Sequence, residues 1–272
     1  MGRIGDKLAA LRRRGETALI PFLTAGDPDL ATTRTLAAEV MRAGADLLEL
    51  GVPFSDPMAD GPTLQRAAAR GLRAGASLPQ VFEIVAEIRR GSDIPIFLLG
   101  YYNPFFRYGL ARVAGDARAA GVDGILCVDL PLEEAGEFQV ETDREGLDLI
   151  LMVAPTTPPS RARMVLRRSR GLVYFVSVTG ITGARSSLPE GLREKIGAVR
   201  AAGRLPVVVG FGISTPEQVR WVAGFADGVV VGSAIAQIVE QHIRDPNLPA
   251  RVYEFVAGLK RACSSAEATV GD

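Results

Sequence analysis

The hydrophobic pattern of the chain repeats eight times, each time as a short apolar run followed by a longer segment of mixed character. The apolar runs are rich in Val, Ile and Leu and lack the alternation of a strand that exposes one face to water. Such runs are typical of strands covered on both faces, and therefore of a parallel sheet. The predicted strands span residues 18–24, 46–50, 95–99, 125–128, 149–153, 171–177, 205–209 and 227–231.

The segments between these runs predict helices. In the first segment, Ile4, Leu8 and Leu11 recur at helical spacing and would share one face. A capping acid or a proline marks the start of others, as at Asp29 and Pro62. The predicted helices span residues 3–14, 30–43, 62–90 (past Gly75), 107–120, 132–145, 158–169, 190–202, 215–224, 234–243 and 249–262.

Eight strand–helix units fit the size and count of a (β/α)8 TIM barrel, which takes about 250 residues. The alternative is a doubly wound open sheet, and the count of eight favours the barrel. The additional N-terminal helix would cover the N-terminal mouth of the barrel, and an extra short helix would follow the eighth strand. No Pro-, Ser- or Gly-rich linker divides the chain, so we expect one domain over residues 1–272, with a frayed tail at 263–272.

Composition narrows the partners and the compartment. The chain has 272 residues, is 47% hydrophobic and 23% charged, and has a formal net charge of zero, which gives no support for nucleic acid or an anionic membrane as a partner. No apolar run approaches the roughly 18 residues of a transmembrane helix, and no cleavable signal is visible. Cys127 and Cys263 make neither a disulfide framework nor a metal cluster. We therefore expect a cytoplasmic protein.

The scarcity of histidine and lysine limits the catalytic groups that the chain can use. His242 is the single histidine, which excludes histidine triads and histidine-rich metal sites. Only three of the 31 basic residues are lysines, and none lies in a strand-like run where a Schiff-base nucleophile would sit. Carboxylates are therefore the available acid–base groups.

One carboxylate, Glu49, lies within an apolar strand, in the stretch 47–61. Burying a carboxylate is costly unless it is partnered or protonated, and proteins tolerate that cost mainly where they do chemistry. The alternative is a structural acid bonded to a Tyr or Ser hydroxyl. Glu49 lies near the carboxyl end of its strand, where barrel enzymes place active groups. Asp60 by itself reads as a turn residue, as does Asp56 before Pro57. We predict that Glu49 and Asp60 face each other across a pocket.

Two glycine-containing loops follow the seventh and eighth predicted strands, at 210–214 and 231–234. In phosphate-binding barrels these loops and the start of a short helix hold a phosphate through backbone N–H groups. The alternative is a pair of tight turns. The loop 179–187 carries two glycines and four hydroxyl residues and predicts a mobile lid, or else a plain surface loop. Apolar residues at strand ends would wall a pocket for a flat apolar group: Phe22, Leu99, Tyr101, Leu126 and Tyr174.

The segment 48–65, LELGVPFSDPMADGPTLQ, resembles the defining motif of the tryptophan synthase alpha chain family. Further segments match the same family in the same order, over nearly the whole chain: 21–28 (PFLTAGDP), 100–104 (GYYNP), 128–131 (VDLP), 179–183 (TGITG), 210–214 (GFGIS) and 232–234 (GSA). The resemblance implies a lyase that splits indole-3-glycerol phosphate into indole and glyceraldehyde 3-phosphate by a retro-aldol reaction, with no cofactor or metal on this chain.

The resemblance also implies residue roles. Glu49 would act as general acid and then base, and Asp60 would accept the indole N–H and stabilise the cationic ring. Implied substrate contacts are Phe22, Leu99, Tyr101, Leu126, Tyr174, Thr182, Gly183 and Phe211. Implied phosphate contacts are Gly183, Gly212, Gly232 and Ser233. Arg185 in the lid departs from some relatives, which carry an acid there.

The family pairs this barrel with a pyridoxal-phosphate beta chain, in an alpha2-beta2 tetramer, and passes indole between them. The matching partner-facing residues are Pro53, Asp56, Pro57, Asn103, Asp129 and Pro131. Three alternatives remain at this point: a stand-alone lyase that releases free indole, a non-catalytic phosphosugar-binding barrel, and a phosphosugar isomerase or aldolase. The last is disfavoured by the scarcity of His and Lys.

Overall fold

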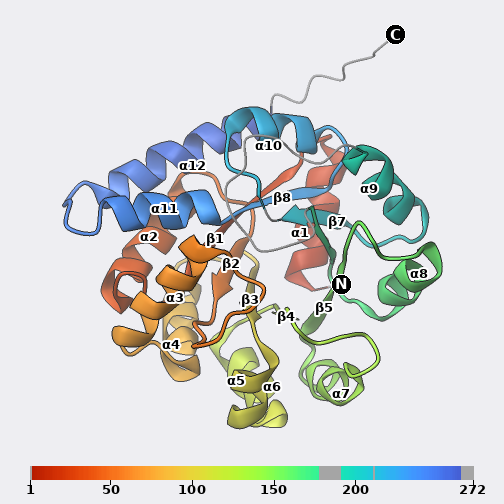
Figure 1. The fold of residues 1–272 in the computed structure, drawn as a ribbon, viewed down its shortest axis with the longest axis horizontal. Coiled ribbons are helices and arrows are strands. Elements are labelled where there is room, and N and C mark those ends of the chain that lie inside the picture. Colours follow the sequence, from red (N-terminus) through yellow and green to blue (C-terminus); the bar gives the residue numbers. More distant parts are fainter. Residues whose placement is uncertain (1, 178–190, 211, 265–272) are drawn as a thin grey trace.

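Eight parallel strands form a closed barrel in the computed structural model, which describes residues 2–177, 191–210 and 212–264. The strands pair in chain order and β8 closes the ring against β1, which confirms the barrel and excludes the open sheet. The helices surround the strands (Figure 1). The strands are β1 (Ala18–Thr24), β2 (Leu48–Gly51), β3 (Ile96–Gly100), β4 (Gly124–Cys127), β5 (Asp148–Val153), β6 (Val173–Val176), β7 (Val207–Gly210) and β8 (Gly228–Val231).

The described helices begin with α1 (Arg3–Arg13), α2 (Leu30–Arg42), α3 (Pro62–Arg73), α4 (Leu78–Arg89), α5 (Tyr102–Tyr108) and α6 (Leu110–Ala120). They continue with α7 (Gly136–Glu145), α8 (Pro159–Arg168), α9 (Leu192–Ala201), α10 (Pro216–Ala223), α11 (Ser233–Gln241) and α12 (Leu248–Ser264). The predicted short extra helix after the eighth strand is α11. No helix in the described ranges is both long and apolar enough to cross a bilayer.

The strands separate two apolar layers. Residues that point outward pack against the surrounding helices, whereas residues that point inward fill the barrel. In β1 the inward set is Ala18, Ile20 and Phe22, and in the stretch leading into β2 it is Leu47 and then Glu49. Because successive side chains of a strand alternate between faces, Glu49 takes an interior position. The interior set forms one buried cluster with α1.

Helix α1 covers the N-terminal mouth of the barrel, as the sequence predicts. Its buried face, Ile4, Leu8 and Leu11, belongs to the interior cluster. The Arg3 guanidinium donates to Asp123, directly before β4, at 2.9 Å. One end of the barrel is therefore closed by apolar packing and an ion pair.

Several element boundaries differ from the predicted ones: the helix predicted over 62–90 is divided into α3 and α4, and two other differences have a clear physical reason. Helix α5 lies where a loop was predicted, because Pro104 stands in its first turn, where a helix tolerates proline, and Gly109 (φ +96°) ends it before α6. The helix predicted to end at residue 262 runs to Ser264, because Cys263 is buried in the core. Cys263 is therefore not part of a frayed tail, and residues 265–272 lie outside the described part of the chain.

Candidate active site

A cavity lies at the carboxyl ends of the barrel strands and opens to solvent; the space between its walls, open solvent included, is about 400 Å³. It is lined by Phe22, Glu49, Asp60, Leu64, Leu99, Tyr174, Gly212, Ile213, Val230, Gly232 and Ser233. Eight of these residues are predicted site residues, and the walls are mostly apolar. The cavity therefore joins the segment around Glu49 and Asp60 to both glycine loops.

Glu49 is fully buried on β2, beside Phe22 of β1 and Phe97 of β3 in the strand register. Neither carboxyl oxygen has a hydrogen-bond partner among the described residues. Burial raises the pKa of Glu49 well above its ordinary value of 4.5, and the charge of Asp60 raises it further. The environment of Glu49 therefore favours the protonated, neutral acid, which has a proton to donate.

Asp60 lies between β2 and α3, and its environment differs from that of Glu49. Burial raises its pKa from 3.8 to about 6, while a hydrogen bond donated by the Tyr101 hydroxyl to Oδ2, at 3.1 Å, acts in the opposite direction. The same hydroxyl accepts the Ala59 N–H at 3.1 Å, which ties the residue before Asp60 to the end of β3. Two carboxyl groups in one cavity therefore stand in different environments, one without a hydrogen-bond partner among the described residues and one held by a tyrosine hydroxyl, as in an acid–base pair.

Glycines make room for the two aromatic rings of the cavity. A Cβ atom at Gly51 would lie 2.5 Å from the Phe22 ring, and one at Gly232 would lie 2.9 Å from the same ring. The Tyr174 hydroxyl lies 2.0 Å from the position of a Cβ at Gly210. Phe22 and Tyr174 can therefore lie flat against backbone, which leaves the cavity open beside Glu49.

The second half of the cavity has the features of an anion cradle. Gly232 precedes α11 and Ser233 is its first residue, so the positive end of the helix dipole faces the cavity. Gly212 contributes a positive φ of +82°, and Ile213 follows it along the wall. Within the part of the chain that the structure describes, no Lys or Arg lines the cavity. Backbone N–H groups and the Ser233 hydroxyl are the donors available to a phosphate.

Several predicted substrate residues lie elsewhere. Leu126 is fully buried in the barrel interior and does not line the cavity, although it stands opposite Leu99 in the strand register. Tyr101 touches Asp60 from an adjoining pocket. Thr182, Gly183 and Phe211, together with Arg185 and the rest of the predicted lid, lie outside the described residues.

Three lining residues were missed by the sequence reasoning. Leu64 lies in the first turn of α3, Val230 points inward from β8, and Ile213 follows the glycine loop after β7. Leu64 and Ile213 stand inside the two motifs already singled out, so their position beside Asp60 and Gly212 was the available signal. Val230 had no signal beyond its place in a strand.

The predicted partner-facing residues form two groups. The exposed ones are Asp56, Asn103, Asp129 and Pro131, whereas Pro53 and Pro57 are buried within the chain and brace the loop that bears Asp56. Asp129 also accepts the Tyr102 N–H at 2.7 Å, at the start of α5. The sequence did not single out Met58 and Phe106. Both are exposed apolar side chains, Met58 in the loop that bears Asp56 and Phe106 on α5 with Asn103.

Comparisons with known proteins agree with this geometry. The family model described as "Tryptophan synthase alpha chain" matches residues 8–264. A tryptophan synthase alpha chain from Geobacter sp. (strain M21) is 54% identical over 261 residues, covering 96% of this chain and 97% of the relative.

Two solved structures extend the agreement to the fold. The tryptophan synthase subunit alpha of Legionella pneumophila is 35% identical, with a TM-score of 0.89 over 97% of this chain and 99% of that one. The tryptophan synthase complex of Pyrococcus furiosus is 38% identical, with a TM-score of 0.82 over 90% of this chain and 98% of that one. The chain therefore belongs to the tryptophan synthase alpha chain family.

Proposed function

We propose that this chain, a lyase of tryptophan biosynthesis by its family, cleaves indole-3-glycerol phosphate into indole and glyceraldehyde 3-phosphate. One observation carries the proposal: a fully buried acid with a raised pKa and a second, hydrogen-bonded acid share an apolar cavity with a helix N-terminus. An indole ring fits the apolar walls, and a phosphate fits the cradle at Gly232 and Ser233.

Glu49 moves protons in the proposed mechanism. Its carboxyl donates a proton to C3 of the indole ring, which places positive charge on the ring nitrogen. The resulting carboxylate then accepts the proton of the side-chain hydroxyl as the aldehyde forms. The carbon–carbon bond breaks and its electron pair returns to the ring, giving neutral indole and a protonated Glu49. The raised pKa of Glu49 supports the first step, because burial favours the protonated form that donates the proton.

Asp60 stabilises the charged intermediate. With a pKa of about 6 it is largely ionised at neutral pH, so it accepts the indole N–H and offsets the positive charge of the protonated ring. Phe22, Leu99 and Tyr174 exclude water from the ring, which strengthens this electrostatic interaction. The Gly232–Ser233 cradle fixes the other end of the substrate.

We further propose that the chain works with a tryptophan synthase beta chain that carries pyridoxal phosphate, in an alpha2-beta2 tetramer in the cytoplasm. The similar Pyrococcus structure is that of a complex. Exposed Asp56, Asn103, Asp129 and Pro131, with the apolar Met58 and Phe106, supply a contact surface of mixed character beside the cavity. Met and aromatic side chains are enriched at protein interfaces, so the exposed Met58 and Phe106 favour a contact on this surface.

An assay of indole release from indole-3-glycerol phosphate, with and without a beta chain, tests the proposal. We expect slow turnover by the chain alone and a steep rise when the beta chain is added. High turnover alone with no stimulation would indicate a stand-alone lyase. Absence of turnover under both conditions, in a folded protein that binds inorganic phosphate, would indicate a non-catalytic phosphosugar-binding barrel.

A further inference from the structure

Two neighbouring helices frame the two halves of the candidate site. Helix α3 begins at Pro62, two residues after Asp60, and α11 begins at Ser233 in the anion cradle. The two helices pack side by side on the outside of the barrel, next to β1 (Figure 1). Their relative position therefore sets the distance between the cradle and Asp60.

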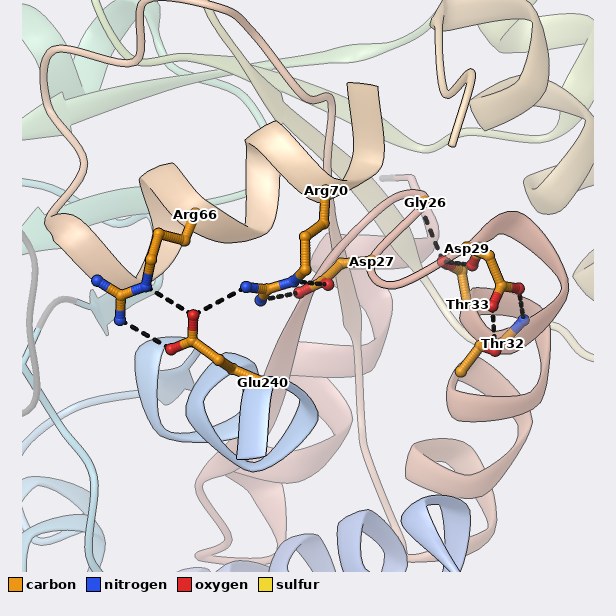
Figure 2. Close-up of polar contacts among 8 residues, drawn as sticks. All are labelled: Gly26, Asp27, Asp29, Thr32, Thr33, Arg66, Arg70 and Glu240. Carbon is orange, nitrogen blue, oxygen red and sulfur yellow. Dashed lines mark hydrogen bonds and ion pairs between the residues drawn. The ribbon is translucent and has the colours of Figure 1, made fainter. Parts of the chain in front are cut away.

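A chain of four charged residues crosses this helix contact (Figure 2). Arg70 of α3 donates from Nε to Asp27 Oδ1 at 2.6 Å and from Nη2 to Asp27 Oδ2 at 3.0 Å. Its remaining nitrogen, Nη1, donates to Glu240 Oε1 of α11 at 2.9 Å. Arg66, one turn earlier on α3, donates to both oxygens of Glu240, at 2.6 and 2.8 Å. Arg70 alone reaches both carboxylates.

The Asp27 end of this series of charged residues is held in place by the loop that bears it. Gly26 has a φ of +80°, and its N–H donates to the Thr33 hydroxyl of α2 at 2.9 Å. A Cβ at Gly26 would lie 2.9 Å from the Cα of Gly71 and 2.6 Å from the Cβ of Ala76, so this loop touches α3 directly. Asp27 is therefore a fixed point of the barrel to which Arg70 ties both helices.

These four charged residues influence one another's pKa values. Burial raises the pKa of Asp27, and the bonds from Arg70 act against that rise. Glu240 lies in the last turn of α11, where the helix dipole disfavours an acid, yet Arg66 and Arg70 hold its pKa at about 2. The side chain of Arg70 is 11% exposed and that of Asp27 is 4% exposed, so water gives this pair little screening.

We infer that Arg70 is a positioning residue for the proposed reaction, because it joins Asp27 and Glu240 and so fixes α11, with its phosphate cradle, relative to Asp60. A substrate anchored by its phosphate at Ser233 presents its ring to Asp60 at a distance that this contact determines. A displacement of about 1 Å at a reacting group can cost on the order of 100-fold in rate. Lysine at this position would supply a point charge and lose the forked geometry. The inference rests on the proposed function.

The chain offers a matched control for a test. Arg89 pairs with Asp123 at 2.6 Å, and the exposed fractions of these side chains are again 11% and 4%. This pair lies before β4, at the end of the barrel opposite the cavity. Arg70→Gln and Arg89→Gln therefore remove equally buried ion pairs, only one of which joins elements of the site.

The experiment measures kcat and KM for indole release by both variants and the wild type, with the beta chain present. Calorimetry supplies the affinity for inorganic phosphate. We expect Arg70→Gln to lower kcat by at least about tenfold while KM and phosphate affinity change by less than about threefold, because the cradle survives and only its spacing is lost. Arg89→Gln should lower the unfolding temperature to a similar degree and leave kcat unchanged.

An unchanged kcat in folded Arg70→Gln, or an equal fall in both variants, would overturn the inference. So would a loss of phosphate affinity as large as the fall in kcat, since that would place Arg70 in the cradle. If Arg70→Gln does not fold, Glu240→Gln cuts the α11 branch alone and must show the same split. Wild-type turnover in the same assay separates this outcome from failure of the proposed function.

Discussion

The Tyr174 hydroxyl lies against the backbone of Gly210, 2.0 Å from where a side-chain Cβ would stand. Tyr174 is fully buried, and burial together with the charges of Glu49 and Asp60 raises its pKa well above 10, so the hydroxyl stays neutral. Tyr174, which lines the cavity, is thus packed directly against a glycine. Neither partner can change alone.

We predict that Gly210→Ala forces Tyr174 into the cavity. Overpacking of this kind costs about 1–3 kcal/mol of stability, and the displaced ring should lower kcat/KM by at least about tenfold. Thermal unfolding and indole release measure the two effects. The control is Gly115→Ala in α6, where no atom lies within 4 Å of the new Cβ. That change should leave turnover intact and add about 0.5–1 kcal/mol of stability. Wild-type activity in Gly210→Ala would contradict the assigned position of Tyr174.

Glu49→Gln removes the transferable proton and keeps the shape of the side chain. We expect indole release to fall by at least about 1,000-fold, because general acid–base catalysis of the reacting carbon is lost. Binding of inorganic phosphate should stay within about twofold, because the cradle is on other elements. Substantial turnover in the folded variant would refute the mechanism.

The raised pKa of Glu49 also predicts that the stability of the wild-type fold depends on pH, and Glu49→Gln tests this. The pKa of Glu49 is 4.5 in the unfolded chain and well above that in the folded chain, so the protonated form is favoured by folding. Its contribution to stability is complete below pH 4.5 and is lost as the pH rises toward the folded pKa. Glu49→Gln does not titrate and should gain stability relative to wild type as the pH rises. If the unfolding temperatures of Glu49→Gln and wild type change in parallel over this pH range, Glu49 is not protonated in the folded chain.

The pKa of Asp60 predicts where activity falls on the acidic side of the pH–activity profile. Below its pKa of about 6 the group is protonated and no longer offsets the charge on the indole ring, so kcat/KM should fall as the pH falls through this value. Tyr101→Phe removes the hydrogen bond that lowers the pKa of Asp60, so the limb should move to higher pH. A limb that stays in place in Tyr101→Phe would assign it to another group.

Asp56 tests the partner-facing loop. It is exposed between the buried Pro53 and Pro57, so Asp56→Ala should leave the fold and the basal rate intact. We expect the variant to lose most of its stimulation by a beta chain, measured by titrating the beta chain in the indole assay. Asp93→Ala removes an exposed acid at the opposite end of the barrel and serves as the control. Equal stimulation of both variants would remove Asp56 from the interface.

Local patterns account for most of the barrel and for Glu49. A carboxylate inside an apolar run can be recognised from the sequence alone, and the number of strands follows from the repeated hydrophobic pattern. Helix α5 was missed because Pro104 argues against helix everywhere except the first turn, and only the structure shows that it stands there. Leu126 is buried in the barrel interior and is not among the residues that line the cavity, and its position in a strand does not reveal which neighbours cover it.

The network around Arg70 was beyond reach of the sequence for a different reason. Its members lie at positions 27, 66, 70 and 240, and each is ordinary in its own segment. Only barrel closure, which sets β8 beside β1, brings the end of the chain to its beginning. Long-range ion pairs of this kind leave no periodic signal.

The apolar filling of the barrel, with α1 across one mouth, has a consequence for ligand traffic. Phe97, Ile150 and Leu172 are buried in the interior cluster together with α1, so apolar packing blocks passage of a small molecule from the cavity through the barrel toward α1. Entry and departure must both use the end that faces the partner loops. Substrate and products therefore share one opening, so a product must leave the cavity before the next substrate molecule can enter it.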